Sequence, residues 1–176
     1  MPLAVIGDIS DPKSGSKLYK IVEMTIDRLE GRYGDRIQFD HKWQIELLEP
    51  DKIQTRWCKV KSVNNYKKCM NDMQVEAFYE VSTGTIILKN DLQMEQPYDV
   101  GSIIHEVTHY MQDRHGLTGR GWYSKCMPWL EYDATLIEQE LITKTGLHIP
   151  SWYTNHLNKW TSHWKNELNL EKTDCK

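Results

Sequence analysis

Apolar residues recur at three- and four-residue steps in several parts of the chain, and this spacing predicts amphipathic helices. The first such segment covers residues 17–30. It is followed by Gly31, and glycine is typical of the residue just after a helix. Three more helices are predicted in the second half of the chain, each opened by a proline. They start at Pro97, Pro128 and Pro150, and the first two end before Gly116 and Gly146. In the last helix we expect an aromatic face in the core, formed by Tyr153, Leu157, Trp160 and Trp164.

Other segments alternate apolar and polar residues, which predicts half-buried strands. Residues 37–47 and 75–81 show this pattern, and the turn 82–85 joins the second strand to a short apolar strand at 86–88. Residues 51–69 fit either a helix or a strand. Because the strands come first and the helices last, the pattern predicts an α+β fold in which C-terminal helices pack a small mixed sheet.

The length of 176 residues corresponds to one domain, and no linker rich in glycine, serine or proline divides it. We therefore expect a single domain over residues 1–170, followed by a polar tail at 171–176. The longest apolar runs are far too short to span a bilayer, so we expect no membrane association.

The formal charge of −3 gives no electrostatic reason to expect a nucleic-acid partner. One stretch interleaves basic and aromatic side chains, a pattern that can hold single-stranded nucleic acid. It comprises Arg56, Trp57, Lys59, Lys61, Tyr66, Lys67 and Lys68. We interpret it as a solvated face with two aromatic residues turned toward the core.

The four cysteines form no CxxC pair, and their spacing shows no disulfide framework. The N-terminus has no basic segment before its short apolar stretch, so we expect no signal peptide and a cytoplasmic, reducing location. A housekeeping and a phage-borne origin fit this equally well.

Two histidines, His105 and His109, lie in the segment HEVTH of the predicted helix that begins at Pro97. Positions four apart differ by about 40° around a helix, so both imidazoles face one space. Such a pair suits two corners of a tetrahedral zinc site. Glu106 lies about 100° around from His105, beside the metal, where it can take a proton from a zinc-bound water.

Two residues are candidates for a third protein ligand, His115 and Glu131. On a continuous helix His115 faces about 240° away from His109, and no glycine lies between His109 and Gly116 to break the helix. Glu131 lies in the first turn of the next predicted helix, which can fold back across a glycine-rich connection. A glutamate there completes a His2Glu site with one position open, so we favour Glu131 and expect one zinc ion per chain.

The apolar strand Thr85–Leu88, the HEVTH helix with Tyr110 and Gln112, and the segment PWLEYDA at 128–134 together resemble the gluzincin branch of zinc metallopeptidases. The resemblance covers residues 75–145 and is strongest for small single-domain members. It implies a zincin-like fold and an extended peptide lying along Thr85–Leu88 as a sheet edge.

The same resemblance implies roles for individual residues. His105, His109 and Glu131, with the small residue Ala134 three places later, would bind zinc, and Glu106 would be the general base. An alternative resemblance, to the metzincins, runs through His115 and would use Met127 as its Met-turn.

Several residues are candidates for supporting roles. Gln112 falls within about 20° of His105 on the helix, so it either hydrogen-bonds a ligand or packs beneath the site. Gluzincins often carry an acidic residue four places after the ligand glutamate, but here Thr135 stands there, with Asp133 nearby. The candidates for stabilising an oxyanion are Tyr123, Tyr132, His115 and His148.

The sequence thus predicts a metallopeptidase that hydrolyses peptide bonds with a zinc-activated water and Glu106 as base. Its partners would be a peptide or protein substrate, and inhibition would come from a loop or a partner protein. The competing interpretation is a zincin-fold binding or regulatory module without useful turnover, which Thr135 and the unassigned oxyanion donor motivate.

Overall fold

A computed structural model describes residues 17–34, 43–61, 65–72, 74–118 and 126–170. The helices of this part of the chain are α1 (Lys17–Leu29), α2 (Pro50–Lys61), α3 (Tyr66–Asp72), α4 (Pro97–Arg114), α5 (Met127–Ile142) and α6 (Ser151–Leu170). The strands are β1 (Gln44–Leu48), β2 (Ala77–Glu80) and β3 (Thr85–Lys89). The expected α+β class is confirmed, whereas the tail 171–176 and the first part of the predicted strand 37–47 lie outside the described residues.

The three strands form one mixed sheet in the order β1-β3-β2. β2 and β3 are the predicted antiparallel hairpin, whose turn contains Gly84 at a φ of 66°, a value that favours glycine. β1 pairs with β3 in parallel, so β3 is the central strand. The expectation that Thr85–Leu88 forms a sheet edge is therefore wrong, and β2 forms the edge on that side.

The burial of β3 explains why it occupies the centre. Ile86 and Leu88 belong to one hydrophobic core, and Ile87, which points the other way, belongs to a second core. A strand covered on both faces reads as a continuous apolar run, as this one does.

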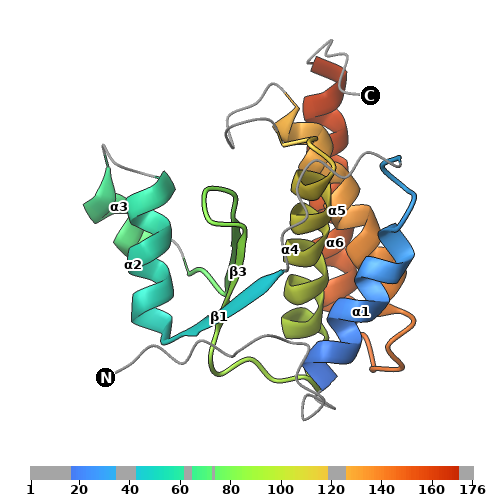
Figure 1. Cartoon of the computed structure of the whole chain (residues 1–176), viewed down its shortest axis with the longest axis horizontal. Helices are drawn as coiled ribbons and strands as arrows, with labels where there is room; N and C mark the ends of the chain where they lie inside the picture. The colour runs from blue at the N-terminus through green and yellow to red at the C-terminus, as the bar shows by residue number, and fades with distance from the viewer. Residues whose placement is uncertain (1–16, 35–42, 62–64, 73, 119–125, 171–176) are drawn as a thin grey trace.

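The sheet lies between two groups of helices (Figure 1). α2 and α3 cover one face over the smaller core, while α4 lies against the other face with α1, α5 and α6 beyond it. α4 packs against α5, α1 and β2, so the HEVTH segment lies in the middle of the molecule. None of the described helices combines the length and apolar character needed to cross a membrane.

The ambiguous stretch 51–69 contains most of α2 and the start of α3, and a disulfide joins these two helices. Cys58 on α2 bonds to Cys69 on α3, and Cys126 is disulfide-bonded as well. The expectation that the cysteines show no disulfide framework is therefore wrong. Both Cys58 and Cys69 are buried, so this disulfide substitutes for part of the core between two short helices.

The aromatic face of α6 is only partly in the core. Tyr153 and Leu157 are buried, but Trp160 is 40% exposed and Trp164 is half-buried. The prediction holds for the first two turns of α6, which pack on α5, and is wrong for the later turns.

Candidate metal centre

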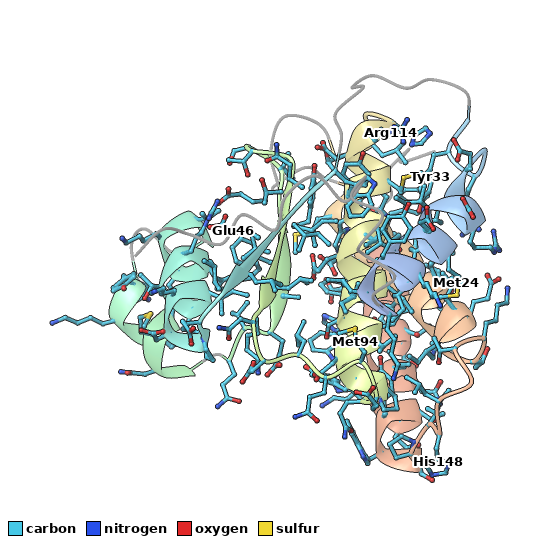
Figure 2. The ribbon with its side chains drawn as sticks, turned by 60° about the horizontal axis from the view of Figure 1, so that its bottom comes forward. Met24, Tyr33, Glu46, Met94, Arg114 and His148 are labelled. Carbon is cyan, nitrogen blue, oxygen red and sulfur yellow. A yellow bond between two sulfur atoms is a disulfide. The ribbon has the colours of Figure 1, made fainter. Side chains whose placement is uncertain are left out.

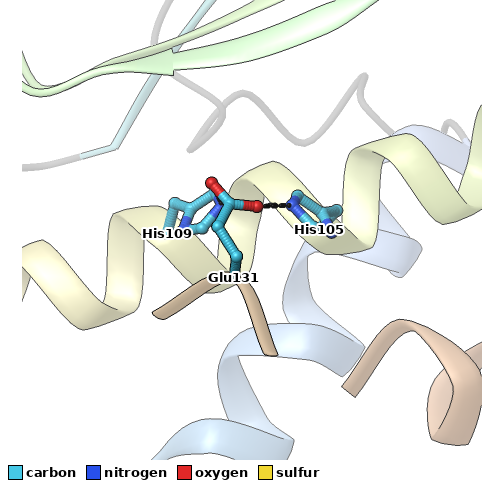
Figure 3. A group of neighbouring side chains, drawn as sticks. All are labelled: His105, His109 and Glu131. Carbon is cyan, nitrogen blue, oxygen red and sulfur yellow. Dashed lines mark hydrogen bonds and ion pairs between the residues drawn. The ribbon is translucent and has the colours of Figure 1, made fainter. Parts of the chain in front are cut away.

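Three side chains from two helices converge on one point (Figure 3). The Nε2 atoms of His105 and His109 lie 3.1 Å apart, and Glu131 at the start of α5 faces both. Its two carboxylate oxygens lie 3.2 Å from Nε2 of His105 and 3.5 Å from Nε2 of His109. Tetrahedral coordination with metal–ligand bonds of 2.0–2.1 Å puts ligand atoms about 3.3 Å apart, so these spacings fit one metal ion. In the described part of the chain, these residues form the group that could hold a metal.

The orientation of His109 is set by Gln112, one turn further along α4. The amide nitrogen of Gln112 donates to the carbonyl oxygen of Leu130 at 3.0 Å and to Asp133 at 3.3 Å. Its oxygen therefore faces Nδ1 of His109, at 2.8 Å. Because that oxygen can only accept, His109 donates Nδ1–H and keeps the lone pair of Nε2 toward the site.

The orientation of His105 is set by a carboxylate that the sequence-based prediction missed. Nδ1 of His105 lies 3.0 Å from Oε2 of Glu138 on α5, and this carboxylate oxygen accepts, so Nδ1 is again the donor. The acid expected four places after Glu131 is thus found seven places after it. The sequence carried a signal, because positions seven apart differ by only about 20° around a helix.

Thr135, where the acid was expected, does not reach a histidine. Its hydroxyl donates to the backbone carbonyl of Glu131, one turn earlier on α5, at 2.8 Å. A threonine hydroxyl in a helix commonly bonds to the backbone one turn earlier, so Thr135 bonds to the backbone of α5 and not to a ligand side chain.

The three converging atoms are consequently all acceptors, and this arrangement requires positive charge. Without a metal, a proton can supply this charge: burial opposes ionisation of Glu131, but the electrostatic effect of His109 and a hydrogen bond from protonated His105 hold the pKa of Glu131 well below its usual range. For His105, burial lowers the pKa, and the hydrogen bonds to Glu131 and Glu138 outweigh this and raise it. The donor set of two imidazoles and one carboxylate suits zinc.

Glu106 connects α4 to the sheet. Its Oε2 accepts a hydrogen bond of 2.7 Å from the backbone N–H of Tyr79, on the outer edge of β2. Burial raises the pKa of Glu106, partly offset by the nearby charges of His105 and His109. A carboxylate with a raised pKa is suited to exchange a proton near neutral pH.

Asp133 connects the site to α1. It accepts hydrogen bonds of 2.5 Å from Arg32 and from the hydroxyl of Tyr33, in addition to the one from Gln112. Figure 2 shows Tyr33 where the end of α1 meets α4. Asp133 therefore holds Gln112, which in turn contacts His109.

His115 is not brought to the metal group. α4 continues unbroken to Arg114, and Nδ1 of His115 donates to the carbonyl oxygen of Met111 at 2.7 Å. The helix ends only at Gly116, whose φ of 75° favours glycine. His115 thus caps α4, and the structure does not support it as a third ligand.

The remaining oxyanion candidates are not placed at the site by any contact described. Tyr123 lies outside the described residues. His148 lies in the connection between α5 and α6, at the opposite end of the helical layer from Arg114 (Figure 2). Tyr132 is half-buried on α5, next to the ligand Glu131 in the chain.

No protein-family model, curated protein or solved structure matches this chain. The gluzincin resemblance therefore rests on the sequence motifs alone.

Proposed function

We propose that this protein is a zinc-dependent metallopeptidase with a zincin-like fold of gluzincin type. The observation that carries the proposal is the convergence of His105, His109 and Glu131, with both Nδ1 atoms held by acceptors and Glu106 one position along the helix. Three protein ligands in tetrahedral geometry leave a fourth position open, which is the arrangement of catalytic rather than structural zinc sites.

The chemistry follows from the residues around that open position. Bound zinc would supply a Lewis acid that lowers the pKa of a bound water to about 7. Oε2 of Glu106 is held by Tyr79 N–H, which leaves Oε1 to take a proton and later return it to the leaving amine. The raised pKa of Glu106 suits this exchange.

The edge of β2 is the candidate substrate-binding strand in place of Thr85–Leu88. Tyr79 N–H points away from β3 and toward Glu106, so the outer edge of β2 borders the proposed catalytic base. An extended peptide adding to this edge would run past Glu106 and the metal group, which supports a peptide as substrate.

The competing interpretation, a binding module without turnover, was supported by two observations, and one of them no longer supports it. It rested partly on Thr135, and Glu138 supplies the carboxylate that was lacking there. The disulfides bear on location: they favour an oxidising compartment over the cytoplasmic one expected from the sequence.

Zinc content is the first test. Wild type, Glu131→Ala and His115→Ala, purified side by side, would be measured by mass spectrometry for zinc per chain. We expect about one zinc in wild type and in His115→Ala, and loss in Glu131→Ala. Wild type that takes up no zinc even after soaking would overturn the proposal.

Turnover is the second test and separates the enzyme from the binding module. A broad peptide library would be incubated with wild type, with Glu106→Gln and with chelator-treated protein. We expect cleavage by wild type alone, although Glu106→Gln retains its zinc because Glu106 is not a ligand. Equal cleavage by Glu106→Gln would exclude Glu106 as the base, and no cleavage by zinc-loaded wild type would favour the binding module.

A further inference from the structure

A chain of two hydrogen bonds connects three helices behind the metal group. The hydroxyl of Tyr153 on α6 donates to Oε1 of Glu138 on α5 at 2.5 Å. Oε2 of the same carboxylate accepts from Nδ1 of His105 on α4 at 3.0 Å. Tyr153 and Glu138 are both buried, so both oxygens of this carboxylate depend on these donors in the protein interior.

α4 carries a glycine where this chain passes it. Gly101 lies one turn before His105, and a Cβ at this position would lie 1.7 Å from the Tyr153 hydroxyl and 2.7 Å from Oε1 of Glu138. Glycine within a helix costs about 1 kcal/mol relative to alanine. Its occurrence in the second turn of α4 is explained by the space that Tyr153 and Glu138 need.

We propose that Glu138 is a positioning residue for His105 and that Tyr153 holds Glu138 in place, so that metal binding is coupled to the docking of α6. This inference rests on the metal site of the proposed function. His105 presents Nε2 to the metal in the tautomer that carries its proton on Nδ1, and Glu138 favours this tautomer and fixes the ring orientation by accepting from Nδ1–H. Without the Tyr153 hydroxyl, Oε1 of Glu138 loses its partner, and the carboxylate is free to turn away from His105.

The coupling acts in both directions, because a coupling free energy between two sites is reciprocal. If the docked hydroxyl of Tyr153 strengthens metal binding, bound metal strengthens the docking of α6 by the same factor. The C-terminal helix is then part of the metal centre although it contributes no ligand.

The test compares zinc affinity among matched variants by competition with a chromophoric chelator. Tyr153→Phe removes the hydroxyl and Glu138→Gln removes the charge. Tyr79→Phe is the control, because the Tyr79 hydroxyl also donates to a carboxylate, Asp113 on α4, at 2.6 Å, but that carboxylate is not bonded to a ligand histidine. We expect Glu138→Gln to bind zinc about 10- to 100-fold more weakly, Tyr153→Phe about tenfold more weakly, and Tyr79→Phe as tightly as wild type.

Two further measurements separate positioning from general stability. The absorption of cobalt(II)-loaded protein reports the ligand geometry, and we expect it to change in Tyr153→Phe and not in Tyr79→Phe. Gly101→Ala displaces the Tyr153 hydroxyl without removing any polar group, so we expect it to weaken zinc binding as well. The Gly101→Ala/Tyr153→Phe pair should lose less than the sum of the single effects, because both changes remove the same hydrogen bond from the Tyr153 hydroxyl to Glu138.

The outcomes distinguish this inference from the proposed function. Wild type that binds no zinc overturns both. Wild type that binds zinc while Tyr153→Phe and Gly101→Ala bind it equally tightly, with unchanged cobalt absorption, overturns the coupling and leaves the metal site intact. If Tyr153→Phe does not fold, Gly101→Ala and Glu138→Gln decide the outcome by the same comparison.

Discussion

The side-chain oxygen of Gln112 lies 2.8 Å from Nδ1 of His109, and this contact determines which imidazole nitrogen faces the metal group. Gln112 cannot reverse its amide without losing two acceptors for its nitrogen, the carbonyl of Leu130 and the carboxylate of Asp133. The site is therefore arranged for a cation by residues that do not touch the cation.

The first prediction concerns Gln112 itself. Gln112→Met keeps the size of the side chain and removes the oxygen that accepts the hydrogen bond from Nδ1–H of His109. We expect zinc affinity to fall about 10- to 100-fold, measured by chelator competition. Gln139→Met is the control, because Gln139 pairs with Asn158 in an exposed position on α5. This variant should bind zinc as tightly as wild type does. Equal affinity in both variants would show that Gln112 only packs beneath the site.

The second prediction compares two arginines of α1 and the adjoining turn. Arg32 pairs with the buried Asp133, whereas Arg28 pairs with Glu140, which is about one-third exposed. We expect Arg32→Met to lower the free energy of unfolding by about 2 kcal/mol, because it leaves a buried carboxylate without its charged partner. Arg28→Met should lower it by about 1 kcal/mol or less, because water screens that pair. Urea unfolding measures both, and equal losses would contradict the distinction.

The site could be predicted from the sequence where its geometry is local. The four-residue spacing of His105 and His109 requires only a helix, and Glu131 requires only that the next helix folds back. Glu138 depends on knowing that α5 continues for two more turns on the same face and that α6 brings Tyr153 to its other oxygen. That arrangement depends on how the helices pack together, which the spacing of residues along the sequence does not show.

The fold shows the same limit. The β2–β3 hairpin is local and was predicted, but the central place of β3 depends on β1 pairing with it in parallel from more than thirty residues away. The continuous apolar run Ile86-Ile87-Leu88 was the available signal that both faces are buried. The Cys58–Cys69 disulfide was not predicted because its cysteines belong to two helices in a stretch whose secondary structure was ambiguous.

The third prediction concerns this disulfide. Cys58 and Cys69 are separated by 11 positions, and closing a loop of that length stabilises the folded state by about 3 kcal/mol in the chain-entropy model. The Cys58→Ala/Cys69→Ala variant should lose about that free energy of unfolding in urea. Its zinc affinity should stay unchanged, because α2 and α3 lie on the face of the sheet opposite the metal group. Loss of zinc binding in a variant that remains folded would contradict this separation.

The fourth prediction concerns the pH dependence of stability and rests on Glu80. Arg56 donates two hydrogen bonds to the Glu80 carboxylate, at 3.1 and 2.7 Å, and these hold the pKa of Glu80 below its ordinary value of 4.5. Unfolded chains therefore bind more protons than folded ones in the range just below pH 4.5, so stability falls as the pH falls through that range. The stabilisation is fully present above pH 4.5 and is lost as the pH passes below the lowered pKa of the folded state.

Glu80→Gln removes this titration and is the variant that tests it. We expect the free energy of unfolding to fall less steeply between about pH 5 and pH 3 than in wild type, by up to about 1.4 kcal/mol per pH unit for one proton. Glu76→Gln serves as the control, because Glu76 pairs with Lys89 in a more exposed position. Urea unfolding at a series of pH values gives both slopes. A Glu80→Gln slope equal to that of wild type would mean that Arg56 does not stabilise the charged form of Glu80, and the ion pair would then contribute to packing alone.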